Sequence, residues 1–173
     1  MEPDIRLIEN FVQDADSLFV QIRDGVDWDE RMRARKTASF GVSYDYSGMT
    51  YPQIPMPDYL AEICRKIEES IGFLPNNCLM NYYPDGKSSM GFHSDSSEEL
   101  AEGTGVVILS LGSVRHITYR LIENKELKVK YALQPGALLH MDNEIQTKWQ
   151  HAIPKEKGAG ERISLTFRHI LKS

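Results

Sequence analysis

Two stretches in the first half of the chain carry apolar residues at helical spacing, over residues 14–25 and 58–71. Pro57 precedes the second stretch and Gly72 follows it, which are common start and stop signals of a helix. We therefore expect two amphipathic helices, the second of which packs its apolar face against a sheet. The apolar positions of the two helices are Leu18, Phe19 and Ile22, and Leu60, Ile63, Cys64, Ile67 and Ile71.

From residue 77 onward the pattern changes to short strands separated by turns. Roughly eight such strands predict a mostly β fold with flanking helices (α+β), built on a double-stranded β-helix, or jelly-roll, core. We expect a single domain over residues 1–173, in which residues 1–76 form an N-terminal helical and lid region and residues 77–173 form the core. The expected strands cover residues 5–11, 78–83, 90–95, 106–111, 116–121, 127–131, 137–141, 149–153 and 162–170.

The last of these strands alternates strictly between polar and apolar residues. Its polar face holds Arg162, Ser164, Thr166 and Arg168. If this face is buried, the two arginines can lean toward each other across roughly 20 Å of backbone, taking ~3.3 Å per residue. They can then hold the two ends of a short dicarboxylate, because a guanidinium pairs with a carboxylate through two hydrogen bonds. The alternative is that this is the solvated face of an edge strand.

A His and an Asp lie two residues apart at His93 and Asp95, and His151 follows much later. Side chains at i and i+2 of a strand point the same way, so His93 and Asp95 can reach one metal ion while His151 comes from a neighbouring strand. Two histidines and one carboxylate are the ligand set of a non-haem Fe(II) site that leaves positions open for a cosubstrate and O2. The alternative is that all three are structural or surface residues.

Asn81 and Tyr83 share one face of the strand expected over residues 78–83, and both can donate hydrogen bonds to a carboxylate. A dicarboxylate that is held by two arginines, an Asn and a Tyr beside an open iron face is what a 2-oxoglutarate site requires. The sequence therefore predicts that Fe(II), 2-oxoglutarate and O2 meet in one pocket.

A basic cluster at residues 31–36, which includes Arg35, leads into a stretch with interleaved aromatic residues that include Tyr44 and Tyr46. Such a stretch can grip phosphates beside a platform on which a base stacks. It can equally be a solvated edge strand whose Lys and Arg side chains prevent aggregation. The residues alone leave these two interpretations open.

The composition limits the classes of protein that fit. The 173 residues carry a formal net charge of −5, whereas a protein that coats nucleic acid without regard to sequence is normally basic. Any contact with nucleic acid should therefore use a local patch or be weak. No apolar run is long enough to cross a bilayer, and the two cysteines form no disulfide framework. We expect a cytoplasmic monomer without membrane contact.

Four segments, taken in order, resemble the AlkB family of Fe(II)/2-oxoglutarate dioxygenases. The resemblance covers residues 30 to 170, and residues 35–48 are also similar to the nucleotide-recognition lid of members that repair DNA or RNA. The four segments are Asn81-Tyr82-Tyr83 with Asp85-Gly86, Phe92-His93-Ser94-Asp95, Trp149-Gln150-His151 with Ile153-Pro154-Lys155, and Arg162-Ile163-Ser164-Leu165-Thr166-Phe167-Arg168.

The resemblance implies a role for each matching residue. His93, Asp95 and His151 would bind iron. Arg162 would take the carboxylate of 2-oxoglutarate remote from iron and Arg168 the near one. The remaining implied cosubstrate residues are Asn81, Tyr83 and Ser164, and the implied substrate contacts are Arg35, Tyr44, Tyr46 and Ser97.

Two positions depart from the family pattern. The family usually has Asn where this chain has Ser164, and repair members usually have Asp or Glu, in contact with the damaged base, where this chain has Ser97.

The activity that the resemblance implies is oxidative demethylation or dealkylation of alkylated bases in DNA or RNA. The base would have to be single-stranded or flipped out of the stack. One alternative keeps the chemistry but acts on a small molecule, a peptide or a protein, which the serine at position 97 favours. Another is a binding module without catalysis, which the complete triad and both arginines disfavour.

Overall fold

The computed structural model describes residues 1–46 and 48–171. The described part contains three helices, α1 (Ala15–Gly25), α2 (Asp58–Ile71) and α3 (Asn143–Lys148). The strands are β1 (Arg6–Ile8), β2 (Lys36–Gly41), β3 (Tyr44–Tyr46), β4 (Met49–Tyr51), β5 (Asn77–Tyr83), β6 (Met90–His93), β7 (Val106–Gly112), β8 (Arg115–Leu121), β9 (Lys128–Leu133), β10 (Leu138–Met141), β11 (Trp149–Ile153) and β12 (Arg162–Arg168).

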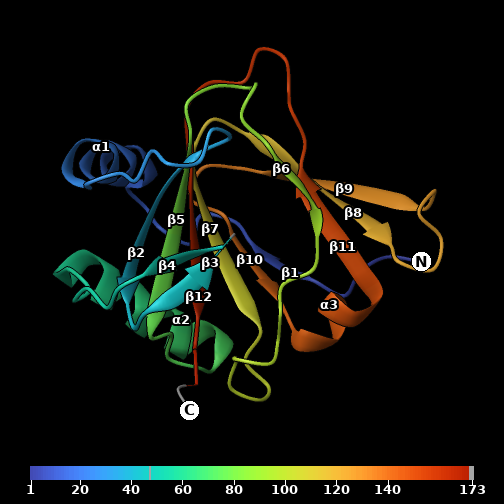
Figure 1. Cartoon of the computed structure of the whole chain (residues 1–173), viewed down its shortest axis with the longest axis horizontal. Coiled ribbons are helices and arrows are strands. Elements are labelled where there is room, and N and C mark those ends of the chain that lie inside the picture. The colour runs from blue at the N-terminus through green and yellow to red at the C-terminus, as the bar shows by residue number, and fades with distance from the viewer. Residues whose placement is uncertain (47, 172–173) are drawn as a thin grey trace.

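Two antiparallel sheets form the body of the protein (Figure 1). The major sheet has the strand order β1-β10-β7-β12-β5-β2, and the minor sheet has the order β6-β11-β8-β9. A separate hairpin, β3–β4, lies in the region of the expected lid. The prediction of a mostly β, jelly-roll fold with flanking helices is confirmed. β1 and β2, from the N-terminal region, join the major sheet and form its two edges.

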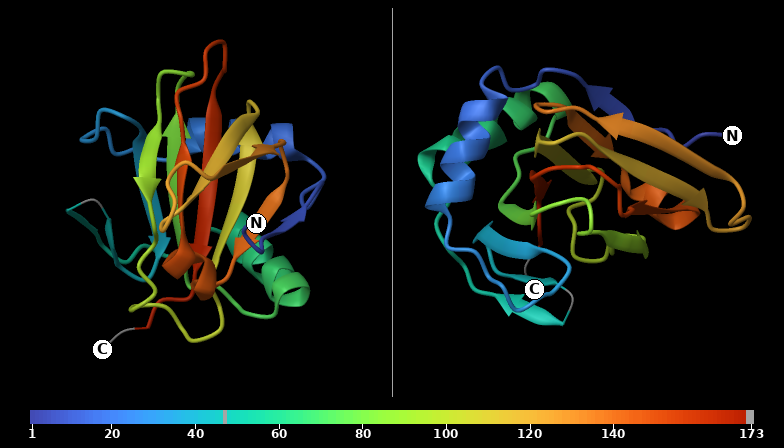
Figure 2. Two further views of the ribbon diagram at one scale, coloured as in Figure 1. Left: turned by 90° about the vertical axis from the view of Figure 1, so that its right-hand side faces the viewer. Right: turned by 90° about the horizontal axis from the view of Figure 1, so that it is seen from above.

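The outer face of the major sheet is covered by α1 and α2 (Figure 2). The apolar stripe of α2 is buried at Leu60, Ile63, Cys64 and Ile67, as its spacing predicts. The helix ends at Gly72, which has a φ of 104° and donates its backbone N–H to Glu68. Glycine suits this position because a side chain would be strained at positive φ.

A second cluster of apolar side chains lies between the major and minor sheets. It includes Trp149 and Tyr119 from the minor sheet and Leu139 from the major sheet. One end of this inter-sheet layer is polar, and the predicted site residues gather there.

β12 lies between β7 and β5 in the interior of the major sheet. Every residue from Arg162 to Arg168 is buried. Ile163, Leu165 and Phe167 belong to the outer cluster under the helices. The alternative of a solvated edge strand is therefore wrong, because hydrogen-bonded neighbours occupy both edges of β12 and packed layers cover both faces.

Three other local predictions differ from the structure. β6 ends at His93, so Asp95 lies beyond the strand that was expected to include it. α3 was not expected, because a helix of six residues is too short to show periodicity. The described chain also has twelve strands where nine were expected; the three additional ones, β2, β3 and β4, precede α2, and β3 and β4 are only three residues long. Within the described ranges, no helix is long and apolar enough to span a membrane.

Candidate metal and cosubstrate site

His93, Asp95 and His151 converge at the polar end of the inter-sheet layer. His93 and His151 are direct partners across the β6–β11 pair, and their ring centroids are 4.3 Å apart. Asp95 places Oδ1 3.7 Å from Nε2 of His93 and Oδ2 3.5 Å from Nε2 of His151. One atom of each residue lies within 4.8 Å of the others, which is close enough to bind one metal ion. The predicted triad is thus assembled.

Two of the three ligands, His151 and Asp95, are in the protonation state that a metal ion needs. Burial lowers the pKa of His151 to about 4, so its imidazole is neutral at pH 7. Burial alone would raise the pKa of Asp95, but the positive charge of Arg168, which also donates a hydrogen bond to the carboxylate, outweighs it and holds this pKa below its ordinary value. Nδ1 of His93 lies 2.8 Å from the carbonyl oxygen of Gly91, which leaves Nε2 facing Asp95.

Arg162 and Arg168 reach the same cavity from β12, and both are nearly inaccessible, with 1% and 3% of their surface exposed. Arg162 donates from Nη2 to Ser110, but its Nε and Nη1 have no partner among the described residues. Arg168 lies 3.3 Å from Asp95 through Nη2, and its Nη1 is likewise without a described partner. Buried guanidinium donors are costly unless an anion accepts their hydrogen bonds. These residues therefore fit a bound dicarboxylate.

The remaining predicted cosubstrate residues line this cavity as well. The ring of Tyr83 packs against Arg162, whose Cζ is 5.0 Å from the ring centroid. Asn81 and Ser164 are paired across β5 and β12. The cavity is lined by Tyr46, Leu79, Asn81, Tyr83, Met90, His93, Asp95, Ile108, Ile117, His151, Ile153, Arg162, Ser164, Thr166 and Arg168. Metal ligands and carboxylate donors thus share one space.

The lid residues pack onto the cosubstrate residues. Arg35 is buried, and it donates from Nε to Oδ1 of Asn81 at 2.9 Å and from Nη2 to the hydroxyl of Tyr46 at 2.8 Å. Tyr44 lies under the guanidinium of Arg168, with 4.9 Å between Cζ and the ring centroid. Arg35 is therefore neither a solvated residue nor a free phosphate contact. Instead, it joins the lid to the cosubstrate cavity.

Ser97 is half-buried in the loop that follows Asp95, and its carbonyl oxygen accepts the backbone N–H of Leu100. It is not among the residues that line the cavity. Its contact with a substrate stays a prediction.

Two residues of the site were missed in the sequence. Arg115 is fully buried and donates to the carbonyl oxygens of Ser88 and Pro154, which holds two loops near the remote end of the cavity. It shares the inward register of β8 with Ile117 and Tyr119, so alternation would have found it. Gln146 accepts the backbone N–H of Asp95, and no periodicity pointed to it.

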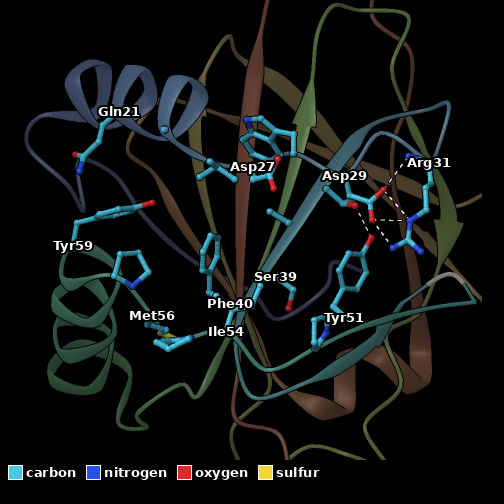
Figure 3. Close-up of a pocket in the computed structure, with 18 residues that line it drawn as sticks. Gln21, Asp27, Asp29, Arg31, Ser39, Phe40, Tyr51, Ile54, Met56 and Tyr59 are labelled. Atoms are coloured by element: carbon cyan, nitrogen blue, oxygen red, sulfur yellow. Dashed lines mark hydrogen bonds and ion pairs between the residues drawn. The ribbon is translucent and has the colours of Figure 1, made fainter.

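A larger groove, of about 860 Å³, lies on the outside of β2 and contains none of the triad (Figure 3). Its walls include four aromatic residues and three prolines. At one end, Arg31 is held by the carboxylate of Asp29 (Figure 3). The guanidinium of Arg31 is therefore engaged within the protein, like that of Arg35. The metal triad and the two arginines line the smaller cavity between the sheets, which is therefore the candidate active site.

Comparison with known proteins agrees with this geometry. The family model of the 2OG-Fe(II) oxygenase superfamily matches residues 7–168. "Alpha-ketoglutarate-dependent dioxygenase alkB homolog 3" of Rattus norvegicus is 33% identical over 92% of this chain and 61% of its own length. "DNA oxidative demethylase ALKBH2" of Bos taurus is 31% identical over 79% of this chain and 53% of its own length. The chain thus spans less than two thirds of the length of these two relatives.

Two further matches extend the comparison. Protein R406 of Acanthamoeba polyphaga mimivirus is 34% identical over 82% of this chain and 74% of its own length. The solved structure of OsALKBH1 has a TM-score of 0.73 over 98% of this chain and 99% of that one, at 18% identity, which supports the fold. With a triad suited to Fe(II) and a clamp suited to 2-oxoglutarate, the chain belongs to the 2OG-Fe(II) oxygenase superfamily and, within it, to the AlkB family.

Proposed function

We propose that this protein uses Fe(II), 2-oxoglutarate and O2 to remove alkyl groups from the nitrogen atoms of nucleobases in DNA or RNA. The observation that carries the proposal is the single cavity that holds both the metal triad and two arginines with unpaired donors. In the aromatic lid, the ring of Tyr44 packs against Arg168, and Tyr46 lines the same cavity. Three requirements of the reaction, namely metal, cosubstrate and a covered entrance, are met in one place.

The protein's own residues bind and orient the reactants. His93, Asp95 and His151 hold the metal by one face. Arg168 lies beside Asp95 and takes the carboxylate near the metal, while Arg162 takes the remote one. When bound, Fe(II) supplies the oxidation of a C–H bond by O2, in which 2-oxoglutarate becomes succinate and CO2. A methyl group that is hydroxylated in this way leaves its nitrogen as formaldehyde.

The lid and the relatives both support a nucleobase as substrate. Tyr44 and Tyr46 are stacked 6.3 Å apart at the entrance, and flat aromatic surfaces of this kind suit a base. Three of the similar proteins carry the name DNA oxidative demethylase. A base inside a duplex could not reach a cavity between two sheets, so the substrate base must be single-stranded or flipped out.

A second candidate substrate is a small molecule, a peptide or a protein. The observation that favours it is the loop after Asp95, where Ser97 stands and where Glu98, Glu99 and Glu102 are exposed. These carboxylates repel phosphates near the site. The chemistry at the metal would be the same.

The test is a substrate screen that measures succinate and formaldehyde with purified protein, Fe(II) and 2-oxoglutarate. We expect methylated single-stranded oligonucleotides to stimulate both products, and unmethylated oligonucleotides of the same sequence to stimulate neither. Equal product with both oligonucleotides, or stimulation by amino acids or peptides alone, would contradict the nucleobase assignment. We also propose that the protein acts as a cytoplasmic monomer, which light scattering and cell fractionation would test.

A further inference from the structure

Asp95 is held differently from the two histidines of the triad. His93 and His151 face each other across the β6–β11 pair, so the backbone hydrogen bonds of the sheet fix their separation. Asp95 lies two residues beyond the end of β6 and has no strand partner. Arg168 contacts its carboxylate at 3.3 Å, and a further interaction is needed to restrain its backbone.

Gln146 provides that interaction from α3. Its Oε1 accepts the backbone N–H of Asp95 at 2.8 Å, and only 5% of the residue is exposed. Because a backbone N–H can only donate, the side-chain oxygen must face Asp95, and Nε2 then faces Sδ of Met141 at 3.7 Å. Beside it, the hydroxyl of Ser94 donates to the carbonyl oxygen of Trp149 at 2.9 Å. Residues 94 and 95 are thus attached to the junction of α3 and β11.

We propose that Gln146 is a positioning residue that presents the carboxylate of Asp95 to the metal ion. Gln146 lies five residues before His151. This short segment therefore carries one metal ligand, His151, and holds another, Asp95, through a hydrogen bond. The bond restrains the backbone of Asp95, from which the carboxylate projects toward both imidazoles. The proposal rests on the metal triad alone and is independent of the identity of the substrate.

The experiment measures binding of Mn(II), a stable substitute for Fe(II), by calorimetry with the full chain and without 2-oxoglutarate or nucleic acid. Gln146→Leu keeps the size of the side chain but removes the acceptor, and Gln146→Asn keeps the amide but shortens its reach. Gln146→Glu keeps an acceptor oxygen at the same distance. Gln150→Leu is the matched control, because Gln150 neighbours His151 but its Oε1 accepts from Arg120.

We expect the Leu and Asn variants to bind Mn(II) ~10- to 100-fold more weakly than the parent protein, in the range typical for groups that orient a metal ligand. The Glu variant should bind Mn(II) about as well as the parent, although its buried charge lowers the melting temperature. Gln150→Leu should leave Mn(II) affinity unchanged.

Two results would overturn the proposal. One is Mn(II) binding by Gln146→Leu or Gln146→Asn that equals that of the parent. The other is Mn(II) affinity that follows the melting temperature across all the variants, with the Glu variant losing as much as the Leu variant, because a merely structural role of Gln146 predicts that pattern. If Gln146→Leu does not fold, Gln146→Asn and Gln146→Glu still separate the two roles.

Discussion

β12 buries both of its faces, but the two faces differ in how completely their side chains are satisfied. Ile163, Leu165 and Phe167 pack under the helices, where contact with apolar neighbours is all that they require. Arg162 and Arg168, on the opposite face, are just as buried and have donors without described partners. One face stabilises the fold, and the other keeps hydrogen-bonding capacity for a ligand. The difference locates the binding site from the accounting of polar atoms alone.

The largest expected effect on activity comes from removing a metal ligand from the cavity. His93→Ala should reduce succinate release to that of the metal-free protein, because two remaining ligands do not form the facial triad. The melting temperature of the apo protein should change little, since His93 is only half-buried. Activity assays and thermal unfolding measure the two effects. An active His93→Ala variant would refute the metal assignment.

Leu165→Ala should have the opposite profile, in which stability is lost and the chemistry is retained. Leu165 has no exposed surface and belongs to the outer cluster. Such truncations cost about 2–5 kcal/mol of unfolding free energy, because a cavity replaces the lost side chain. Chemical denaturation measures the loss, and the 2-oxoglutarate KM at low temperature serves as the control. A large rise in that KM would show that the two faces of β12 are coupled.

Arg162→Met tests whether the unpaired donors serve only the ligand. Loss of a buried charge partner of the cosubstrate should raise the 2-oxoglutarate KM on the order of 100-fold. The apo protein should be as stable as the parent or more so, because a desolvated cation is replaced by an apolar side chain. Steady-state kinetics measure the KM, and thermal unfolding without 2-oxoglutarate measures the stability of the apo protein. A strongly destabilised apo protein would mean that Arg162 supports the fold itself.

The sequence predicted the two faces of β12, because strict alternation follows directly from strand geometry. It also predicted the members of the triad, although the i, i+2 strand argument for Asp95 was wrong because β6 ends at His93. It did not predict how Asp95 is held, because that depends on a hydrogen bond between residues 51 positions apart. Nor did it predict that Arg35 is buried. A basic stretch has the same sequence pattern whether its arginines face solvent or, like Arg35, donate a hydrogen bond to an Asn on a strand that is adjacent only in the folded sheet.

The smallest expected effect on activity comes from a change in the lid, where Tyr46 lines the cavity from outside the two main sheets. Tyr46→Phe removes the hydroxyl that accepts from Arg35 but keeps the ring, and Arg35 retains Asn81 as a partner. One hydrogen bond of about 1 kcal/mol corresponds to a roughly fivefold rise in the KM for a methylated oligonucleotide. The 2-oxoglutarate KM should not change, because Arg162 and Arg168 are untouched. Tyr44→Phe is the control, since the described contact of Tyr44 with Arg168 uses its ring. If Tyr46→Phe raised the 2-oxoglutarate KM instead, Tyr46 would contribute to binding of the cosubstrate. It would then belong to the same binding site as Arg162 and Arg168 and not to the substrate lid.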